Sequence, residues 1–351
     1  MMWFSFSTIS RKASGSKRKS LLVFWFILLA ALTAAILGAY NRSHRHKPPP
    51  LEKITLGIAA NDNAALVHIA SGLDLFSKNG LDVSLKEYES GSLAVRDLAE
   101  GKLDFATAAD FSFAVEGFVR DDLRALTTIS VSSDNALLIA RRDRGIESPH
   151  DLEGKTIGVV QGTSSEFFLA TFLAFHGILN SEVRIVDIRP SETTLDIMKG
   201  AIDAAMLWEP YAFLLRTALG KNATVWDGQG GQDYYFLLIS TGSYIASHRG
   251  TVEKLLRALA EAEQSAEFDP ARAKRIIQRR FHYSDQYMAW MWPKSRLEVG
   301  LTQDLLILME DEARWHRKKE AMDYDRIPNY YSFIYLEGLE RVKPNAVTII
   351  H

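Results

Sequence analysis

Short apolar runs alternate with amphipathic stretches along most of the chain. Ile54 to Ala60 is almost entirely apolar, which predicts a buried strand. Ala64 to Lys78 has apolar residues at helical spacing, and Asn79-Gly80 supplies a stop signal for that helix. Leu81 to Glu87 alternates apolar and polar residues, as a half-buried strand does. The continuing alternation of strands and helices predicts an α/β fold with mainly parallel sheets covered by helices.

One helix–strand–helix–strand unit occurs twice, about a hundred residues apart. The second helix of each unit ends in Gly-x-x-Asp before a short apolar strand, at Gly101 to Asp104 and again at Gly200 to Asp203. A repeat of this length is too long for a solenoid. It predicts two similar α/β lobes with a central ligand cleft between them.

Two further strand-like stretches indicate where the chain crosses between the lobes. Ala136 to Ala140 follows the expected first crossing, and Tyr235 to Ser240 is the candidate return strand. These two crossing strands place the first lobe at residues 54–133 and 240–351, and the second lobe at residues 134–239.

Composition narrows the class of protein. At 351 residues, with 47% hydrophobic and 24% charged residues, the chain fits about two globular domains. A net charge of −2, with no Lys/Arg stripe beyond the N-terminus, gives no electrostatic case for a nucleic-acid partner. The absence of cysteine excludes disulfides, thiolate catalysis and cysteine-based zinc sites.

The N-terminal residues carry the signal for location. Lys17-Arg18-Lys19 precedes Leu21 to Tyr40, an uncharged run long enough to cross a bilayer as a helix, and the basic residues favour an N-in orientation. The alternative is a cleaved signal peptide, with Thr33-Ala34-Ala35 as its small-residue site. The expected segments are a cytoplasmic tail at 1–20, a transmembrane anchor or signal segment at 21–40, and a linker at 41–53.

Candidate site residues follow from the position of the strands. In open α/β sheets, ligands bind beyond the carboxyl ends of strands, near helix N-termini. Applied to both lobes, this rule selects polar and small residues in the turns that follow strands. The predicted ligand-binding residues are Asn61, Asp62, Asn63, Ser90, Gly91, Ser92, Asp110, Gly162, Thr163, Ser164, Trp208 and Glu209.

Two of these positions indicate the chemistry of the ligand. Gln161 to Ser165 combines a glycine with hydroxyls and free N–H groups, which suits a small anion or polar head group; the alternative is an ordinary helix N-cap. The indole of Trp208 suits a planar ligand, unless it is a core residue. Together, Asp62, Asp110 and Glu209 predict an acidic cleft. Such a cleft favours a zwitterionic, amine-bearing or heterocyclic ligand over a bare inorganic anion.

Motifs for catalysis are absent from the sequence. It contains no G-x-S-x-G elbow, no P-loop and no H-E-x-x-H, and its histidines lack a metal-ligand spacing. Gly228 to Gly231 has the composition of a nucleotide loop but lacks the strand-to-helix context, so we expect a turn there. The sequence therefore predicts a protein that is not an enzyme and needs no metal or cofactor.

Several segments, in order and spacing, resemble one known family. They are Gly72 to Val83, Gly101 to Ala106, Asp151 to Val159, Gly200 to Ala204, Trp208 to Tyr211 and the closing Val342 to Ile349. In these segments the chain resembles the substrate-binding proteins of ABC importers for sulfonate, nitrate, taurine or thiamine pyrimidine precursors, the SsuA/THI5-like or NMT1-like family.

The resemblance implies a type II periplasmic-binding fold that closes on a small ligand and delivers it to an ABC permease and its ATPase. The implied ligand is sulfonate-, taurine- or nitrate-like, or aminopyrimidine-like. The implied location is periplasmic, either anchored to the inner membrane by residues 21–40 or secreted if that segment is cleaved. Two alternatives remain: a membrane-tethered ligand sensor using the same cleft, and a pyrimidine-precursor synthase-like enzyme, whose family members carry a cysteine-rich motif that this chain lacks.

Overall fold

The structure is a computed structural model that describes residues 24–35, 50–320 and 327–350. The chain divides into two compact units, Met1–Pro50 and Leu51–His351. In the first unit, residues 24–35 are helical. Among the described residues, no helix combines the length and apolar character needed to cross a membrane. The structure therefore does not show the predicted transmembrane helix, and the rest of that segment, residues 21–23 and 36–40, lies outside the described residues.

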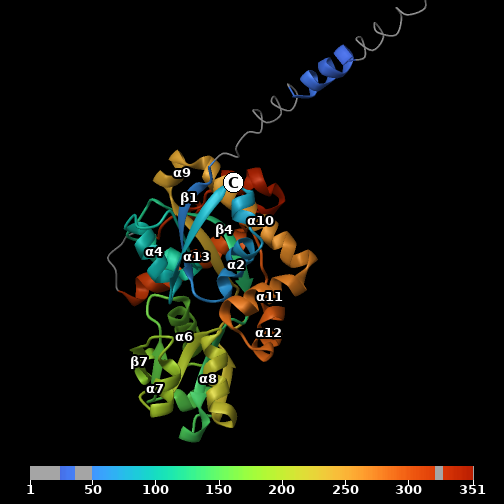
Figure 1. The fold of residues 1–351 in the computed structure, drawn as a ribbon. Coiled ribbons are helices and arrows are strands. Elements are labelled where there is room, and N and C mark those ends of the chain that lie inside the picture. The colour runs from blue at the N-terminus through green and yellow to red at the C-terminus, as the bar shows by residue number, and fades with distance from the viewer. Residues whose placement is uncertain (1–23, 36–49, 321–326, 351) are drawn as a thin grey trace, which may run out of the picture. The chain divides into compact units, whose positions relative to one another are not determined.

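The second unit contains two five-stranded sheets (Figure 1). The first sheet has the order β2-β1-β3-β10-β4. In it, β1 pairs in parallel with β2 and β3, while β10 runs antiparallel to β3 and β4. The bounds of its strands are β1 Glu52–Ala59, β2 Leu81–Tyr88, β3 Phe105–Ala109, β4 Leu123–Ser132 and β10 Tyr234–Thr241.

The second sheet repeats this arrangement with the order β7-β6-β8-β5-β9. Here β6 pairs in parallel with β7 and β8, and β5 runs antiparallel to β8 and β9. Its strands are β5 Ala136–Arg141, β6 Thr156–Val159, β7 Arg184–Asp187, β8 Ala204–Trp208 and β9 Ala223–Asp227. The prediction of two similar α/β lobes is confirmed.

Helices cover both sheets, and most of them belong to the first lobe (Figure 1). The helices beside the first sheet are η1 Asp62–Ala64, α2 Ala65–Gly72, α3 Leu75–Lys78, α4 Gly91–Ala99, α5 Asp110–Glu116, α9 Gly242–Ser247, α10 Arg249–Phe268, α11 Pro270–Phe281, α12 Asp285–Met291, η6 Trp292–Lys294, α13 Gln303–Lys319, η7 Tyr330–Phe333, α14 Leu336–Val342 and η8 Pro344–Ala346. Those of the second lobe are η2 Arg142–Arg144, η3 Pro149–Leu152, α6 Ser164–Phe175, η4 Asn180–Glu182, α7 Thr193–Lys199, α8 Tyr211–Leu219 and η5 Gly220–Asn222.

The two Gly-x-x-Asp repeats have the same structural role in the two lobes. The carboxylate of Asp104 accepts hydrogen bonds from the backbone N–H of Thr55 at 2.7 Å and from its hydroxyl at 2.8 Å. In the second lobe, Asp203 accepts from the backbone N–H of Thr156 at 3.0 Å. Each repeat therefore ties two neighbouring parallel strands of its lobe together, β3 to β1 in the first lobe and β8 to β6 in the second.

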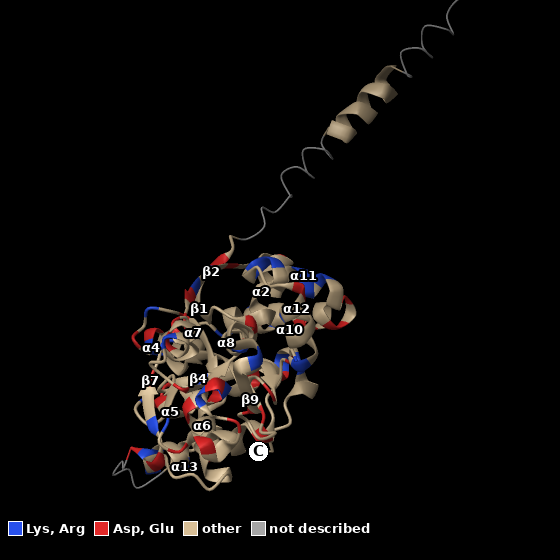
Figure 2. Cartoon of the chain, turned by 90° about the horizontal axis from the view of Figure 1, so that it is seen from below, with Lys and Arg blue, Asp and Glu red and all other residues tan. Residues whose placement is uncertain are grey.

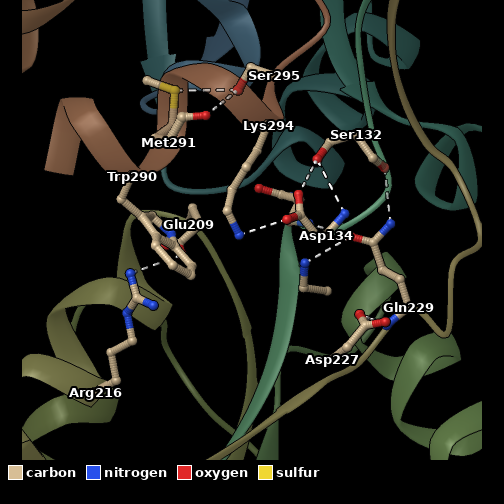
Figure 3. Close-up of polar contacts among 12 residues, drawn as sticks. Ser132, Asp134, Glu209, Arg216, Asp227, Gln229, Trp290, Met291, Lys294 and Ser295 are labelled. Atoms are coloured by element: carbon tan, nitrogen blue, oxygen red, sulfur yellow. Dashed lines mark hydrogen bonds and ion pairs between the residues drawn. The ribbon is translucent and has the colours of Figure 1, made fainter.

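The chain passes between the sheets twice, and one glutamine joins both crossings. The first crossing lies between Ser132 and Ala136, and the second lies at residues 228–233. The Gln229 side chain accepts from the backbone N–H of Ala136 at 2.9 Å and of Asn135, and it donates to the Ser132 carbonyl at 3.0 Å (Figure 3). The return lies earlier than the predicted boundary after residue 239, because Tyr234–Thr241 hydrogen-bonds to β3 and β4 as a strand of the first sheet.

Basic residues gather along α11 (Figure 2). Its sequence, PARAKRIIQRRF, holds five Lys and Arg residues, and only Ala273 and Ile277 are buried. This helix is an exception to the expectation that no basic stripe lies beyond the N-terminus. One of its arginines, Arg280, forms an ion pair with Glu87 of β2.

Candidate ligand-binding site

A pocket lies between the lobes at the carboxyl ends of parallel strands from both sheets. Residues at the ends of β1, β3 and β8 border it, namely Ala59, Ala109 and Trp208. Its atom-free space, with the open mouth included, is about 420 Å³. The lining residues are Ala59, Asn61, Ser90, Gly91, Ala109, Ser112, Asn135, Ala136, Thr163, Ser164, Ser165, Phe168, Trp208, Tyr234 and Phe236. This is the position at which open α/β sheets bind ligands.

Half of the predicted site residues line this pocket. They come from both lobes and are Asn61, Ser90, Gly91, Thr163, Ser164 and Trp208. The other half, which are not among the lining residues, are Asp62, Asn63, Ser92, Asp110, Gly162 and Glu209.

The N-terminus of α4 approaches the pocket closely because it begins with a glycine. A Cβ on Gly91 would lie 2.6 Å from Cα of Ala108, which is a backbone atom of β3 and cannot move aside. The preceding Ser90 is buried, and its hydroxyl bonds the hydroxyl of Ser92 at 2.8 Å. Glycine therefore lets the start of α4, with its unpaired N–H groups, lie directly against the sheet.

The start of α6 has an arrangement that an ordinary N-cap does not require. Thr163 precedes the helix but makes no side-chain cap; its hydroxyl donates to the carbonyl of Val160 at 2.7 Å and bonds the Ser165 hydroxyl at 2.8 Å. The Ser164 hydroxyl is buried and lies near the Asp110 carboxyl, but it makes no hydrogen bond of normal geometry. These contacts satisfy the Thr163 and Ser165 hydroxyls within the loop and leave the Ser164 hydroxyl without a partner among the described residues.

Three buried polar atoms on the pocket walls have no hydrogen-bond partner among the described residues. They are Nδ2 of Asn135, Oγ of Ser164 and Nε1 of Trp208. In the described part of the chain, other buried polar atoms also lack partners, but none of those belongs to a lining residue. A buried donor left unpaired costs about 1–3 kcal/mol, and a hydrogen-bond acceptor placed in the pocket would relieve that cost.

Asp62 and Asp110 do not make the pocket acidic, because protein groups already occupy their oxygens. Asp62 accepts from the hydroxyls of Tyr287 at 3.1 Å and Tyr283 at 3.3 Å. Asp110 accepts from the backbone N–H groups of Phe111 at 2.8 Å and Tyr235 at 3.0 Å. Burial raises the pKa of each carboxyl to about 7.

Glu209 also points away from the pocket. Its carboxylate accepts from the backbone N–H of Phe213 and from the indole Nε1 of Trp290, each at 2.8 Å. Burial raises the pKa of Glu209. The structure therefore does not place the three predicted carboxylates in an acidic cleft.

Two of the remaining predicted residues make structural contacts nearby. The backbone carbonyl of Asn63 accepts from Ser130 at 3.0 Å. The carbonyl of Gly162 accepts from the Ser112 hydroxyl at 3.2 Å, and this bond joins the second lobe to α5 of the first. In the described part of the chain, no cluster of three or more His, Cys, Asp and Glu residues could hold a metal ion.

Several lining residues were not predicted, and two signals in the sequence could have identified some of them. Phe168 lies four residues after Ser164 and so on the same face of α6. Tyr234 and Phe236 are two residues apart on β10 and so point to the same side of the sheet. Asn135 lies in a crossing between the lobes, which necessarily borders the cleft.

Comparisons with known proteins agree with this geometry. The family described as NMT1/THI5 like matches residues 61–273. A Bacillus subtilis protein named as an aliphatic sulfonates-binding protein is 29% identical over 239 residues, which is 64% of this chain and 68% of that protein. The taurine-binding periplasmic protein of Escherichia coli is 23% identical over 219 residues, 61% of this chain and 67% of that protein.

A solved structure shows the same fold. The alkanesulfonate-binding protein SsuA from Xanthomonas axonopodis pv. citri, bound to MOPS, superposes with a TM-score of 0.70. The match covers 82% of this chain and 99% of that protein, at 16% sequence identity. The two sheets and the cleft between them therefore form the α/β fold of periplasmic binding proteins.

Proposed function

Because the chain belongs to the NMT1/THI5-like family, we propose that it is a solute-binding protein that captures a small polar organic ligand between its lobes. The observation that supports this most directly is the set of unpartnered donors on the pocket walls, Asn135, Ser164 and Trp208. Relatives named for aliphatic sulfonates and for taurine support the same class of ligand.

The donors favour a ligand with an oxygen-rich head group of low charge. No Lys or Arg is among the described lining residues, so the head group would meet neutral donors and the N-termini of α4 and α6. A sulfonate carries one negative charge and three acceptor oxygens, which fits these donors. Phe168 and Phe236 supply an apolar wall for a short carbon chain. We therefore place an alkanesulfonate or taurine ahead of an aminopyrimidine or nitrate.

We further infer that the protein works outside the cytoplasm and delivers its ligand to an ABC permease. The periplasmic location named for the Escherichia coli relative supports the first inference. Either role predicted for residues 21–40, anchor or cleaved signal, leads to the same location for the folded unit. We propose binding without turnover.

Isothermal titration calorimetry of the purified chain tests the proposed ligand. Taurine, 1-butanesulfonate, nitrate and an aminopyrimidine are titrated in turn, and we expect saturable binding of a sulfonate. Trp208→Phe removes the pocket N–H and should weaken binding about tenfold or more. Trp226→Phe is the matched control, because Trp226 packs against Phe172 outside the pocket lining. Binding of the aminopyrimidine alone would contradict the sulfonate assignment, and the absence of any binding would contradict the proposed function.

A further inference from the structure

One edge of the cleft is held by a tryptophan that does not line the pocket. Trp290 lies near the end of α12, and its Nε1 donates to Oε1 of Glu209 at 2.8 Å (Figure 3). Glu209 directly follows Trp208 at the end of β8. This hydrogen bond therefore joins α12 of the first lobe to the end of β8 in the second lobe, where Trp208 lines the pocket.

The start of α12 is fixed to the first lobe. The Tyr287 hydroxyl donates to both oxygens of Asp62 at 3.1 Å, and the Tyr283 hydroxyl, just before the helix, lies 3.3 Å from the same carboxylate. Tyr287, Met288 and Met291 are buried in the large core cluster, which includes residues of both lobes. The hydrogen bonds of Tyr283 and Tyr287 to Asp62 therefore place Trp290 on the first lobe.

Two cations, each balanced by a carboxylate, lie over the Trp290 ring. The guanidinium carbon of Arg216, from α8 of the second lobe, is 3.7 Å from the ring centroid, and the ammonium of Lys294 is 3.6 Å from it. Arg216 lies 3.9 Å from Glu209, and Lys294 pairs at 2.6 Å with Asp134 in the first crossing (Figure 3). Contacts between cations and aromatic faces strengthen when the groups are shielded from water.

Separation of the lobes would remove both contacts that Trp290 makes with the second lobe. Glu209 is only 4% exposed, and its Oε1 would lose the hydrogen bond from Trp290 Nε1. Arg216 would lose its contact with the Trp290 ring. The first contact requires α12 to meet the end of β8, and the second requires it to meet α8. They therefore favour the closed arrangement of the lobes, in which the pocket walls also come together.

We propose that Trp290 is a positioning residue for ligand capture, which holds the Trp208–Glu209 strand end against α12 and thereby favours lobe closure. This inference rests on the proposed function, because it concerns the same pocket. Trp290 is not among the lining residues, so its effect reaches the ligand through Glu209 and through closure.

Three substitutions separate this role from general packing. Trp290→Phe keeps an aromatic ring for the cations and removes the N–H that Glu209 accepts. Arg216→Met removes the cation of the second lobe and keeps most of the side-chain length. Trp292→Phe is the matched control, because the Trp292 ring lies 5.5 Å from Lys274 of its own lobe. Thermal unfolding verifies that each variant is folded.

Lobe closure is measured without ligand by pulsed EPR. The chain has no cysteine, so spin labels at Asp82→Cys on β2 and Lys199→Cys on α7, both exposed, report one distance between the lobes. We expect Trp290→Phe and Arg216→Met to shift this distance towards longer values, and Trp292→Phe to leave it unchanged. With 1-butanesulfonate or taurine as the probe, Trp290→Phe should lower affinity about tenfold.

An unchanged distance distribution in Trp290→Phe would overturn the proposal, whatever the affinity, because the effect would not pass through closure. A shift in Trp292→Phe equal to that in Trp290→Phe would also overturn it. If neither probe binds the unsubstituted chain, the proposed ligand class fails, yet the EPR comparison still decides the role of Trp290.

Discussion

The two lobes share a strand order but fill it with side chains of different size. The register pairs Leu56 with Phe105 in the first lobe and Ile157 with Ala204 at the matching position of the second. Phe105 packs edge-on against Tyr244 of α9, a helix that only the first lobe possesses. The duplicated framework therefore depends on shared backbone hydrogen bonds, while side-chain volume follows the helices that cover each sheet.

The largest expected effect comes from the matched position at which the first lobe has Phe105 and the second has Ala204. Phe105 is fully buried, and Phe105→Ala should lower the free energy of unfolding by about 3–5 kcal/mol, because it leaves a cavity beneath α9. Urea denaturation followed by circular dichroism measures this loss. Leu93→Ala on α4, where the side chain is exposed, is the control and should change stability by less than about 0.5 kcal/mol. A loss below about 1 kcal/mol for Phe105→Ala would show that the first lobe is as stable with alanine at this position, the residue that the second lobe has as Ala204.

The first lobe also buries a histidine, and this should make its stability depend on pH. Burial, assisted by nearby Arg280, lowers the pKa of His68 to about 4, against about 6.5 in an unfolded chain. The unfolded state therefore takes up the proton first, and the stability due to neutral His68 is lost as the pH falls from about 6.5 to 4. At pH 5 the loss relative to pH 7 should be about 2 kcal/mol.

His68→Leu isolates this contribution from other titrating groups. The unfolding free energy of the unsubstituted chain minus that of the variant should fall by about 2 kcal/mol between pH 7 and pH 5. Urea denaturation at each pH measures this difference. A difference that stays constant with pH would mean that His68 is accessible to protons in the folded chain.

The shared hydrogen bonds can be tested by matched substitutions of the two repeat aspartates. Asp104→Ala and Asp203→Ala should each destabilise the chain by about 1–2 kcal/mol, because each leaves a threonine N–H, on β1 or on β6, without its acceptor. Asp104→Ala also removes the acceptor of the Thr55 hydroxyl, whereas Asp203→Ala also removes a partly exposed ion pair with Arg144 at 2.6 Å. Partly exposed ion pairs contribute little, so Asp104→Ala should cost slightly more. Chemical denaturation of both variants in one buffer gives the comparison. A negligible effect in one lobe would show that the repeat is structural in the other alone.

The smallest effect is expected at an exposed contact between the lobes. Arg189 lies 3.8 Å from Glu89 of the first lobe and 3.0 Å from Glu192, and its side chain is 68% exposed. Arg189→Ala should therefore change both stability and ligand affinity by no more than about 0.5 kcal/mol. Calorimetric titration measures the change in affinity, and a thermal melt measures the change in stability. An effect larger than this would show that this edge of the cleft contributes as much as the buried contacts at Trp290.

Local patterns were sufficient to predict the lobes and part of the pocket. The strand ends, glycines and hydroxyls at Ser90, Gly91, Thr163 and Ser164 depend on residues close in sequence, so their position could be inferred from the chain. The boundary of the second lobe was harder to predict. Nothing in the apolar strand Tyr234–Thr241 indicates which sheet it joins, because that depends on pairing with β3 and β4, more than a hundred residues earlier.

Long-range partners also explain why the predicted acidic cleft does not form. Asp62 and Glu209 follow strands, as ligand-binding residues often do. Their partners Tyr287 and Trp290 come from α12, and no local pattern reveals that this helix returns to the cleft. Asn135 was missed for a related reason, since its place in the pocket depends on Gln229, which holds its N–H from the other crossing.

The single amide of Gln229 has a mechanical consequence for the way the lobes move. Its oxygen holds Asn135 and Ala136, and its nitrogen donates to the carbonyls of Ser132 and Gln232, so neither crossing can slide without the other. We therefore expect the two crossings to act as a single hinge, so that lobe motion changes mainly the angle between the lobes. If the proposed ligand binds between the lobes, we expect a longer ligand to be accommodated by a larger angle between them, with little change within each lobe.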